Sequence, residues 1–199
     1  MKIKHDELVY SKNVIEFVTV ANEFCLFSEN ALEYEKTDFI DRTLKMLSLL
    51  YLKTSLLQQT DYINQDGNEK FVTEFDWLLI KNNISTLLED DDLYLDFFDS
   101  NMEETAEPVS CSISENIADI YQDLKDFISV YRLNIPDLMN DALAECIDNF
   151  GQIWGYRLVN TLKILHLLKN KKNDGKSSFL TNDTTERSSQ PENLFKKRG

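Results

Sequence analysis

The chain has 199 residues, of which 42% are hydrophobic and 28% are charged, and these proportions are enough for the core of one domain. It carries 35 acidic residues against 21 basic ones, a formal net charge of −14 at pH 7. This excess of negative charge disfavours binding to nucleic acids and to anionic membranes. Glycine and proline are scarce, with five and three residues, and this favours long helices over a many-turned β-sandwich.

The three cysteines, Cys25, Cys111 and Cys146, stand far apart and form no C-x-x-C pair. This pattern argues against a disulfide framework and against a zinc site, and we expect reduced thiols. The first residues lack the apolar run of a signal peptide, and no run of 18 apolar residues is present to cross a membrane. We therefore expect a cytoplasmic protein without a cofactor and without nucleic-acid or membrane partners.

Hydrophobic periodicity predicts three helices in the first half of the chain. The first is expected over residues 12–29, with Ser11 as its N-cap. The second is expected over 38–60, and its apolar residues surround most of the helix, which is typical of a central position in a bundle. A third helix is predicted over 71–88, after a loop at 64–68 that is rich in Asn, Asp and Gly.

The second half begins with a weakly periodic acidic segment over 89–110, for which we expect a turn of helix or a packed loop. Ser114 is the predicted N-cap of a fourth helix, whose apolar stripe extends from Ile117 to Tyr131. A fifth helix opens near Pro136, a favourable first helical residue, and continues to about Leu168.

Gly151 and Gly155 lie four residues apart within the predicted fifth helix. They predict either a bend or break, or the close approach of a neighbouring helix, and we favour close approach. After residue 172 the apolar rhythm gives way to Ser, Thr, Asn and charged residues. The predicted fold is all-α: a single helical bundle of about five to seven helices over 1–172, followed by a disordered polar tail over 173–199.

Charge is unevenly distributed along the chain. No Lys or Arg occurs between Lys81 and Lys125, and the twelve acidic residues in that interval contribute −12 to the net charge. From Lys169 onward eight basic residues outnumber four acidic ones, so the end of the chain is +4. This segregation indicates an acidic docking surface for a basic protein partner or for the chain's own tail. The alternative interpretation is a solvated acidic loop.

Asp119, Asp123 and Asp126 recur at i, i+4 and i+7, so one face of the predicted fourth helix carries three carboxylates. Carboxylates at this spacing can hold a metal in a helical bundle, but the Glu-x-x-His pairs of di-metal bundles are absent. The face lies opposite the apolar stripe that contains Ile117 and Tyr121. We therefore expect it to face water, unless another helix or subunit covers it.

Two further polar residues lie among apolar ones. Arg157 follows Trp154 by three residues, where it is expected to form a buried ion pair that fixes helix packing or to extend its head to the surface. The alternative for Arg157 is an anion-holding role, and stacking on Trp154 is a further option. His166 has leucines on both sides, and a hydrogen-bonded packing role is favoured over a catalytic one.

Several short segments carry a further signal: 15–25, 117–126, 141–143, Phe150 with 154–155, and 162–166. Together they resemble a bacterial family catalogued as domain of unknown function 5063, over about residues 14–168. The resemblance implies an all-helical cytoplasmic protein and no assigned activity. It also singles out the residues of the matching motifs, which are Asp119, Tyr121, Asp123, Trp154 and His166.

The leading functional hypothesis is a non-catalytic binding or adaptor protein that uses its acidic segment or the groove beside the predicted fourth and fifth helices. The alternative is a metal- or anion-binding enzyme with its site near Asp119, Asp123, Arg157 and His166, although no catalytic motif or metal-ligand motif is present. A third hypothesis is a homo-oligomer formed through the last turns of the fifth helix. The candidate functional cluster has six residues: Asp119, Tyr121, Asp123, Trp154, Arg157 and His166.

Overall fold

The computed structural model describes residues 5–64, 67–97 and 108–171. The predicted tail over 173–199 and the middle of the acidic segment lie outside these residues. The helices are α1 (His5–Val9), α2 (Lys12–Glu29), α3 (Lys36–Ser55), α4 (Glu74–Leu88), α5 (Ile113–Tyr131), α6 (Pro136–Asn149) and α7 (Gly155–Asn170). The predicted all-α bundle is confirmed. Among the described residues, no helix combines the length and the apolar character needed to span a bilayer.

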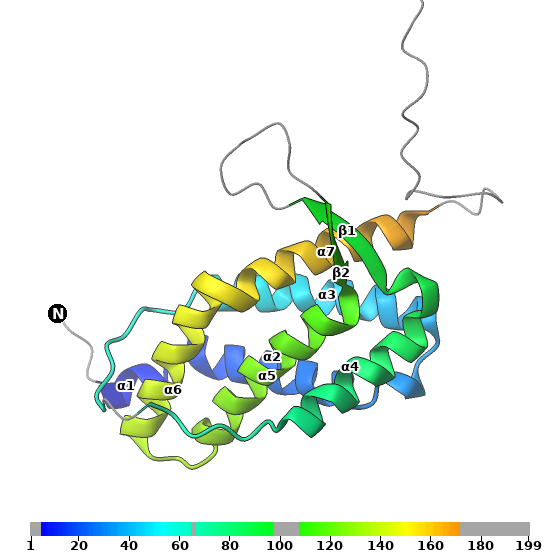
Figure 1. Ribbon diagram of the computed structural model, residues 1–199. Coiled ribbons are helices and arrows are strands. Elements are labelled where there is room, and N and C mark those ends of the chain that lie inside the picture. The colour runs from blue at the N-terminus through cyan, green and yellow to red at the C-terminus, as the bar shows by residue number, and fades with distance from the viewer. Residues whose placement is uncertain (1–4, 65–66, 98–107, 172–199) are drawn as a thin grey trace, which may run out of the picture.

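Helix α5 lies at the centre of the bundle. It packs against α2, α4, α6 and α7, and its Ile113, Ile117, Ile120 and Leu124 are fully buried. Figure 1 shows α5 between α4 on one side and α6 and α7 on the other, with α2 and α3 behind. Helix α5 is therefore the central helix. Its apolar stripe lies on one side, but neighbouring elements also cover its polar face.

The predicted central position of the second helix is wrong. This helix is α3, which packs on α2 and α7 and leaves Leu49 and Leu52 exposed at 41% and 52%. A helix with apolar residues all round can thus lie at the surface when its neighbours cover only part of it.

The predicted fifth helix is two helices, α6 and α7, joined by a π-helical turn over Phe150–Trp154. The amide of Gly155 donates to the carbonyl oxygen of Phe150, five residues earlier. A Cβ on Gly155 would lie 2.2 Å from that oxygen, whereas one on Gly151 would meet nothing within 4 Å. The atoms nearest to Gly155 all belong to Phe150, so close approach of a neighbouring helix is not the reason for the glycine. The local break is the alternative that applies.

The acidic segment forms a β-ribbon at its ends, which corrects the prediction of a helical turn or packed loop. Strands β1 (Leu93–Phe97) and β2 (Pro108–Ser112) pair antiparallel, with Leu93 opposite Ser112. A short 3-10 turn over Glu89–Asp91 leads from α4 into the ribbon. Figure 1 shows the ribbon beside α7, at one edge of the bundle.

The junction of the ribbon with α5 is built around Asp92. Its Oδ1 accepts a hydrogen bond from the amide of Ser114 at 2.7 Å, and its Oδ2 accepts one from Ser112 Oγ at 3.1 Å. The N-cap of α5 is Ser112, whose Oγ accepts from the amide of Glu115, and not Ser114 as predicted.

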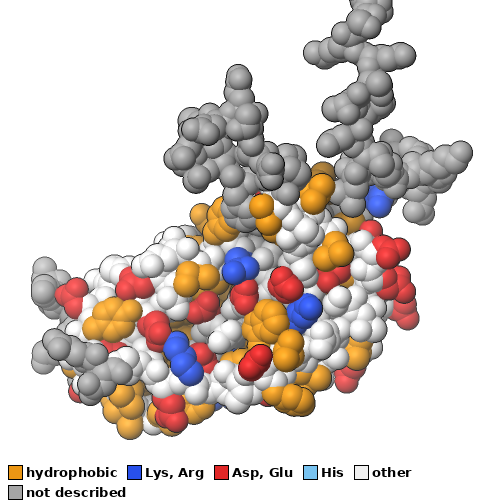
Figure 2. All heavy atoms as spheres, in the orientation of Figure 1, with side chains coloured by type: hydrophobic (Ala, Val, Ile, Leu, Met, Phe, Trp, Pro, Cys, Tyr) orange, Lys and Arg blue, Asp and Glu red, His pale blue; other side chains and the backbone are white. Residues whose placement is uncertain are grey.

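The described part of the acidic segment does not present a continuous acidic surface. Lys36 Nζ lies 2.6 Å from Asp91 Oδ2 and 3.8 Å from Glu89 Oε2, and the side chain of Asp96 is buried and accepts from Asn160 Nδ2 at 2.9 Å. On the face shown in Figure 2, acidic side chains are interspersed with Lys, Arg and hydrophobic ones. Several of these carboxylates therefore already have partners within the chain.

Residues 56–73, which we call the connector, join α3 to α4, and its described parts, 56–64 and 67–73, contain no helix or strand. The connector runs along the lower ends of α6 and α5 in the view of Figure 1. The predicted helices over 38–60 and 71–88 were thus too long at the ends that face it. Helix α4 begins after Thr73, which forms a capping box with Asp76.

Candidate functional site

The carboxylate face of α5 is covered, and the prediction that it faces water is wrong. Asp126 is 5% exposed, and its Oδ1 accepts hydrogen bonds from the amides of Phe71 and Val72 at 2.7 and 2.9 Å. Asp123 is half-buried and accepts from Asn149 Nδ2 at 2.6 Å. A helical wheel gives the direction of a side chain but not what lies above it. Here the connector and α6 supply the cover.

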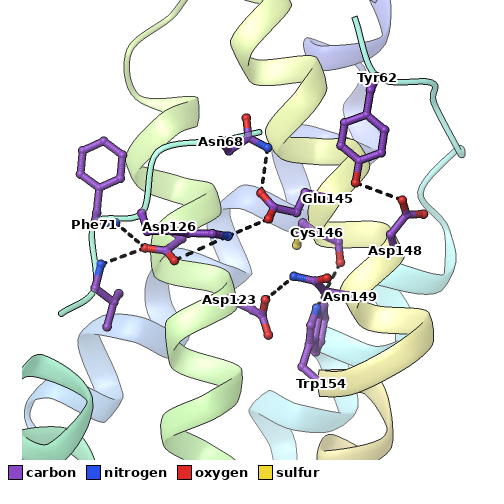
Figure 3. Close-up of polar contacts among 12 residues, drawn as sticks. Tyr62, Asn68, Phe71, Asp123, Asp126, Glu145, Cys146, Asp148, Asn149 and Trp154 are labelled. Carbon is purple, nitrogen blue, oxygen red and sulfur yellow. Dashed lines mark hydrogen bonds and ion pairs between the residues drawn. The ribbon is translucent and has the colours of Figure 1, made fainter. Parts of the chain in front are cut away.

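A small hollow between α5 and α6 contains these carboxylates (Figure 3). We call it the acidic recess. Its polar lining residues come from three elements: Asn68, Glu69 and Lys70 of the connector, Asp123 and Asp126 of α5, and Glu145 and Asn149 of α6. Phe127, Val130, Ala142 and Cys146 complete the lining.

Lys70 is the basic residue of the recess. Its Nζ lies 2.7 Å from Glu145 Oε1 and 3.9 Å from Asp126 Oδ2, and Asn68 Nδ2 donates to Glu145 Oε2 at 2.8 Å. Burial on its own lowers the pKa of Lys70, but the hydrogen bond to Glu145 and the surrounding carboxylates outweigh it, and the net pKa is raised. Lys70 is therefore held in its charged form.

Asp123 differs from the other carboxylates of the recess. Removal from water raises its pKa to about 6, and the negative charges of Asp126 and Glu145 act in the same direction. The hydrogen bond from Asn149 and the charge of Lys70 oppose this rise and only partly offset it. Asp123 consequently changes its charge close to neutral pH, where an ordinary aspartate is fully ionised.

The connector is bound to α6 by a second carboxylate site. The two carboxylate oxygens of Asp141 accept from the amide of Ile63 at 2.6 Å and from the amide of Asn64 at 2.9 Å, and the side chain of Asn64 adds a bond of 2.8 Å. Burial opposes ionisation of Asp141, but these donors prevail and its net pKa is lowered. Asp141 is thus an ionised anchor for the backbone.

Asp141, Glu145 and Asp148 lie at i, i+4 and i+7 on α6, and all three contact the connector. Asp148 accepts a hydrogen bond from Gln59 Nε2 at 2.8 Å and, as Figure 3 shows, one from Tyr62 Oη at 3.1 Å. None of these three residues is among the six candidates predicted from the sequence. The signal was present, because their spacing is the same as that of the three aspartates on α5.

Asp119 and Arg157 meet away from the recess in an ion pair between α5 and α7. Arg157 Nη1 lies 2.8 Å from Asp119 Oδ2, and Trp77 Nε1 donates to Asp119 Oδ1 at 2.7 Å. Arg157 also donates to Asn116 Oδ1 at 3.3 Å, and Asn116 Nδ2 donates to Tyr94 Oη at 2.7 Å. This network ties α4, α5, α7 and β1 together, with the Arg157 side chain 39% exposed.

The other three candidates lie in separate places. Tyr121 donates to Glu29 Oε1 at 2.9 Å, at the end of α2, and Trp154 is fully buried with Nε1 bonded to the carbonyl of Cys146. His166 is exposed on α7, which corrects its prediction as a packing residue. The six candidate residues therefore do not converge on one cavity. Of the six, Asp123 alone lines the acidic recess.

The described residues offer no group of three or more His, Cys, Asp or Glu side chains arranged to hold a metal ion. The three cysteines are free, and Cys146 lines the recess. Burial raises the pKa of the Cys146 thiol, so it stays neutral and unreactive. The chemistry available in the recess is therefore the binding of charge and the exchange of a proton at Asp123.

The sequence pattern of a family described as domain of unknown function (DUF5063) matches residues 8–171. The chain belongs to this family. The resemblance seen in its short motifs is thereby confirmed, and the matched residues of this DUF5063 chain include every residue of the recess. No curated protein matches the chain.

A solved structure gives a second comparison. The DUF5063 chain is 43% identical to protein BF1032 from Bacteroides fragilis, whose crystal structure is known, with 84% of this chain and 98% of that chain covered. The TM-score is 0.75. The two proteins are thus similar over nearly all of the described bundle.

Proposed function

We propose that this chain is a non-catalytic binding protein that takes a cationic side chain of a partner protein into the acidic recess. The observation that carries the proposal is Asp123, an aspartate half-buried between α5 and α6 with its pKa raised to about 6. A partly buried carboxylate with a raised pKa is a candidate functional group, because pKa values shifted by burial are common at sites that bind or act on a ligand.

The charges of the recess favour a cation. The acidic residues that line the recess, Glu69, Asp123, Asp126 and Glu145, outnumber its one basic residue, Lys70, so the recess is negative, and ionisation of Asp123 adds one more negative charge. Asn149 is the hydrogen-bond donor to Asp123 among the described residues, and it contacts only Oδ1. An ammonium or guanidinium group beside Oδ2 would stabilise the ionised form, so binding would release the proton that Asp123 holds below its pKa.

The proposed partner is a basic protein, as the charge segregation indicated. Its proposed docking site is the acidic recess and not the acidic segment. The described carboxylates of the acidic segment are largely paired within the chain, as with Asp91 and Lys36. The recess lies instead in the groove beside α5 and α6. We take the cytoplasm as the compartment, since three free cysteines suit a reducing environment.

The anion-binding enzyme has less support, because Arg157 is paired with Asp119 and His166 lies apart from both. Self-association through α7 stays a second option. It is favoured by the exposure of Leu167 at 60% in the last turn of that helix.

The test compares two variants that remove one negative charge each. Asp123→Asn keeps the shape of the recess, and Asp90→Asn changes an exposed residue of the acidic segment. Blocked pentapeptides with a central lysine or arginine between glycines serve as probes in isothermal titration calorimetry, with norleucine and citrulline peptides as neutral controls. We expect Asp123→Asn to lower affinity for the basic probes about tenfold and Asp90→Asn to leave it within about twofold. An equal loss in both variants would mean general charge attraction and would refute the proposal.

A further inference from the structure

The connector is attached to the bundle by polar contacts. None of its described side chains is buried, and Leu57 and Val72 are its partly buried apolar residues that pack against the core. Among the described residues, the hydrogen bonds and ion pairs that join positions 58–72 to the helices end on five helix side chains: Asp126, Asn140, Asp141, Glu145 and Asp148. Four of these five are carboxylates.

The attachment has two centres. At the upstream centre Asp141 holds the amides of Ile63 and Asn64. At the downstream centre Asp126 holds the amides of Phe71 and Val72. In each case one carboxylate binds two consecutive backbone N–H groups, an arrangement that depends on the charge of the acceptor.

The helices at the two ends of the connector are held independently of it. Helix α3 packs on α2 and α7, and α4 packs on α5. The N-terminus of α4 is capped within itself, because Thr73 and Asp76 bond to each other. Detachment of the connector therefore breaks polar contacts at α5 and α6 but leaves the helix-to-helix packing in place.

We propose that the connector is a strap that detaches from α5 and α6 while the bundle stays folded, and that its detachment uncovers the acidic recess. The strap contributes Asn68, Glu69 and Lys70 to the recess, so its removal takes away one wall and the internal cation. Segments with few buried apolar contacts open at lower free energy than the core of a protein. The strap thus controls access to Asp123.

This inference does not depend on cation binding, because the strap's contacts belong to the chain without a ligand. If the cation proposal holds, the two are coupled, since Lys70 and an incoming cation then compete for Glu145 and Asp126. The strap is tested without any probe molecule, so failure of one proposal is distinguishable from failure of the other.

The test is hydrogen exchange with mass spectrometry on the full chain at neutral pH. In Asp141→Asn and Asp126→Asn one oxygen and the charge of an anchor are lost, and Asp90→Asn is the control of equal charge. We expect peptides from 57–73 to exchange at least about tenfold faster in the two anchor variants, with α5 and α7 changed by less than about twofold. Faster exchange of α5 and α7 to the same extent, or no change in the connector, would overturn the strap.

A second measurement uses the natural chain and covers the case in which an anchor variant fails to fold. Exchange is followed in a series of low urea concentrations. Amides of the connector are expected to exchange by a small opening that urea hardly affects, and those of α5 by an opening that urea strongly promotes. The same urea dependence for both groups would show that the connector opens only with the whole bundle, which contradicts the proposal.

Discussion

At the scale of single residues, Asp123 and Asp141 have pKa values shifted in opposite directions, because burial prevails at Asp123 and hydrogen-bond donors prevail at Asp141. Asp141 accepts two backbone amides and a side-chain amide, and its pKa is lowered. Asp123 accepts one side-chain amide while partly withdrawn from water, and its pKa is raised to about 6. The sequence showed the two as similar residues on amphipathic helices, since the donors come from the connector and from α6. These partners are fixed only when the chain has folded.

The raised pKa of Asp123 predicts a pH-dependent effect of Asp123→Asn on stability. A folded-state pKa of about 6 lies above the ordinary aspartate value of 3.8, so the folded form binds the proton more tightly. The resulting stabilisation is complete below the unfolded pKa and is lost as the pH rises through about 6. Asparagine removes the charge and keeps an oxygen for Asn149.

We therefore expect Asp123→Asn to be more stable than the natural chain by about 1–3 kcal/mol at about pH 8, and nearly equal to it at about pH 4. Urea denaturation at several pH values measures this difference. Asp90→Asn, at an exposed position, should show no such trend. A variant that is less stable at high pH, or a difference that does not vary with pH, would contradict the raised pKa.

At the scale of elements, the helices were predictable because their apolar periodicity is strong, and their ends were not. Leu57, Phe71 and Val72 continue the apolar pattern beyond α3 and before α4, so the predicted helices extended into the connector. In the β-ribbon, burial does not follow the usual alternation of buried apolar and exposed polar residues. Leu93 is 60% exposed while Asp96 is buried against Asn160, so a rule that places apolar residues inside could not identify the strand.

The π-helical turn between α6 and α7 gives a prediction for its two glycines. In Gly155→Ala the new Cβ meets the backbone oxygen of Phe150, which has to move, and we expect a loss of about 2–4 kcal/mol in the free energy of unfolding. Gly151→Ala adds a methyl group in open space within a helical turn, so we expect it to be neutral or to stabilise by up to about 1 kcal/mol. Equal effects of the two substitutions in urea denaturation would count against the role of Gly155.

At the scale of the whole molecule, the uneven charge of the sequence does not become a single acidic face in the described residues. Part of the acidic interval is paired with Lys36 or buried in the ribbon, and the three aspartates of α5 face α4, α6, α7 and the connector. The recess owes its character to residues more than fifty positions apart, such as Lys70 and Asp126. Its existence could be predicted neither from periodicity nor from charge counts, because both describe one segment at a time.

The proposed function requires Asp123 to bind a cation in the acidic recess. The most direct measurement is a carbon-13 NMR titration of the Asp123 side-chain carboxyl group, without and with the lysine pentapeptide. We expect a pKa of about 6 in the free chain, and a lower value when the peptide is present in excess, because the bound ammonium favours the ionised form. An ordinary aspartate pKa of about 4 in the free chain, or a pKa that the peptide leaves unchanged, would contradict this expectation.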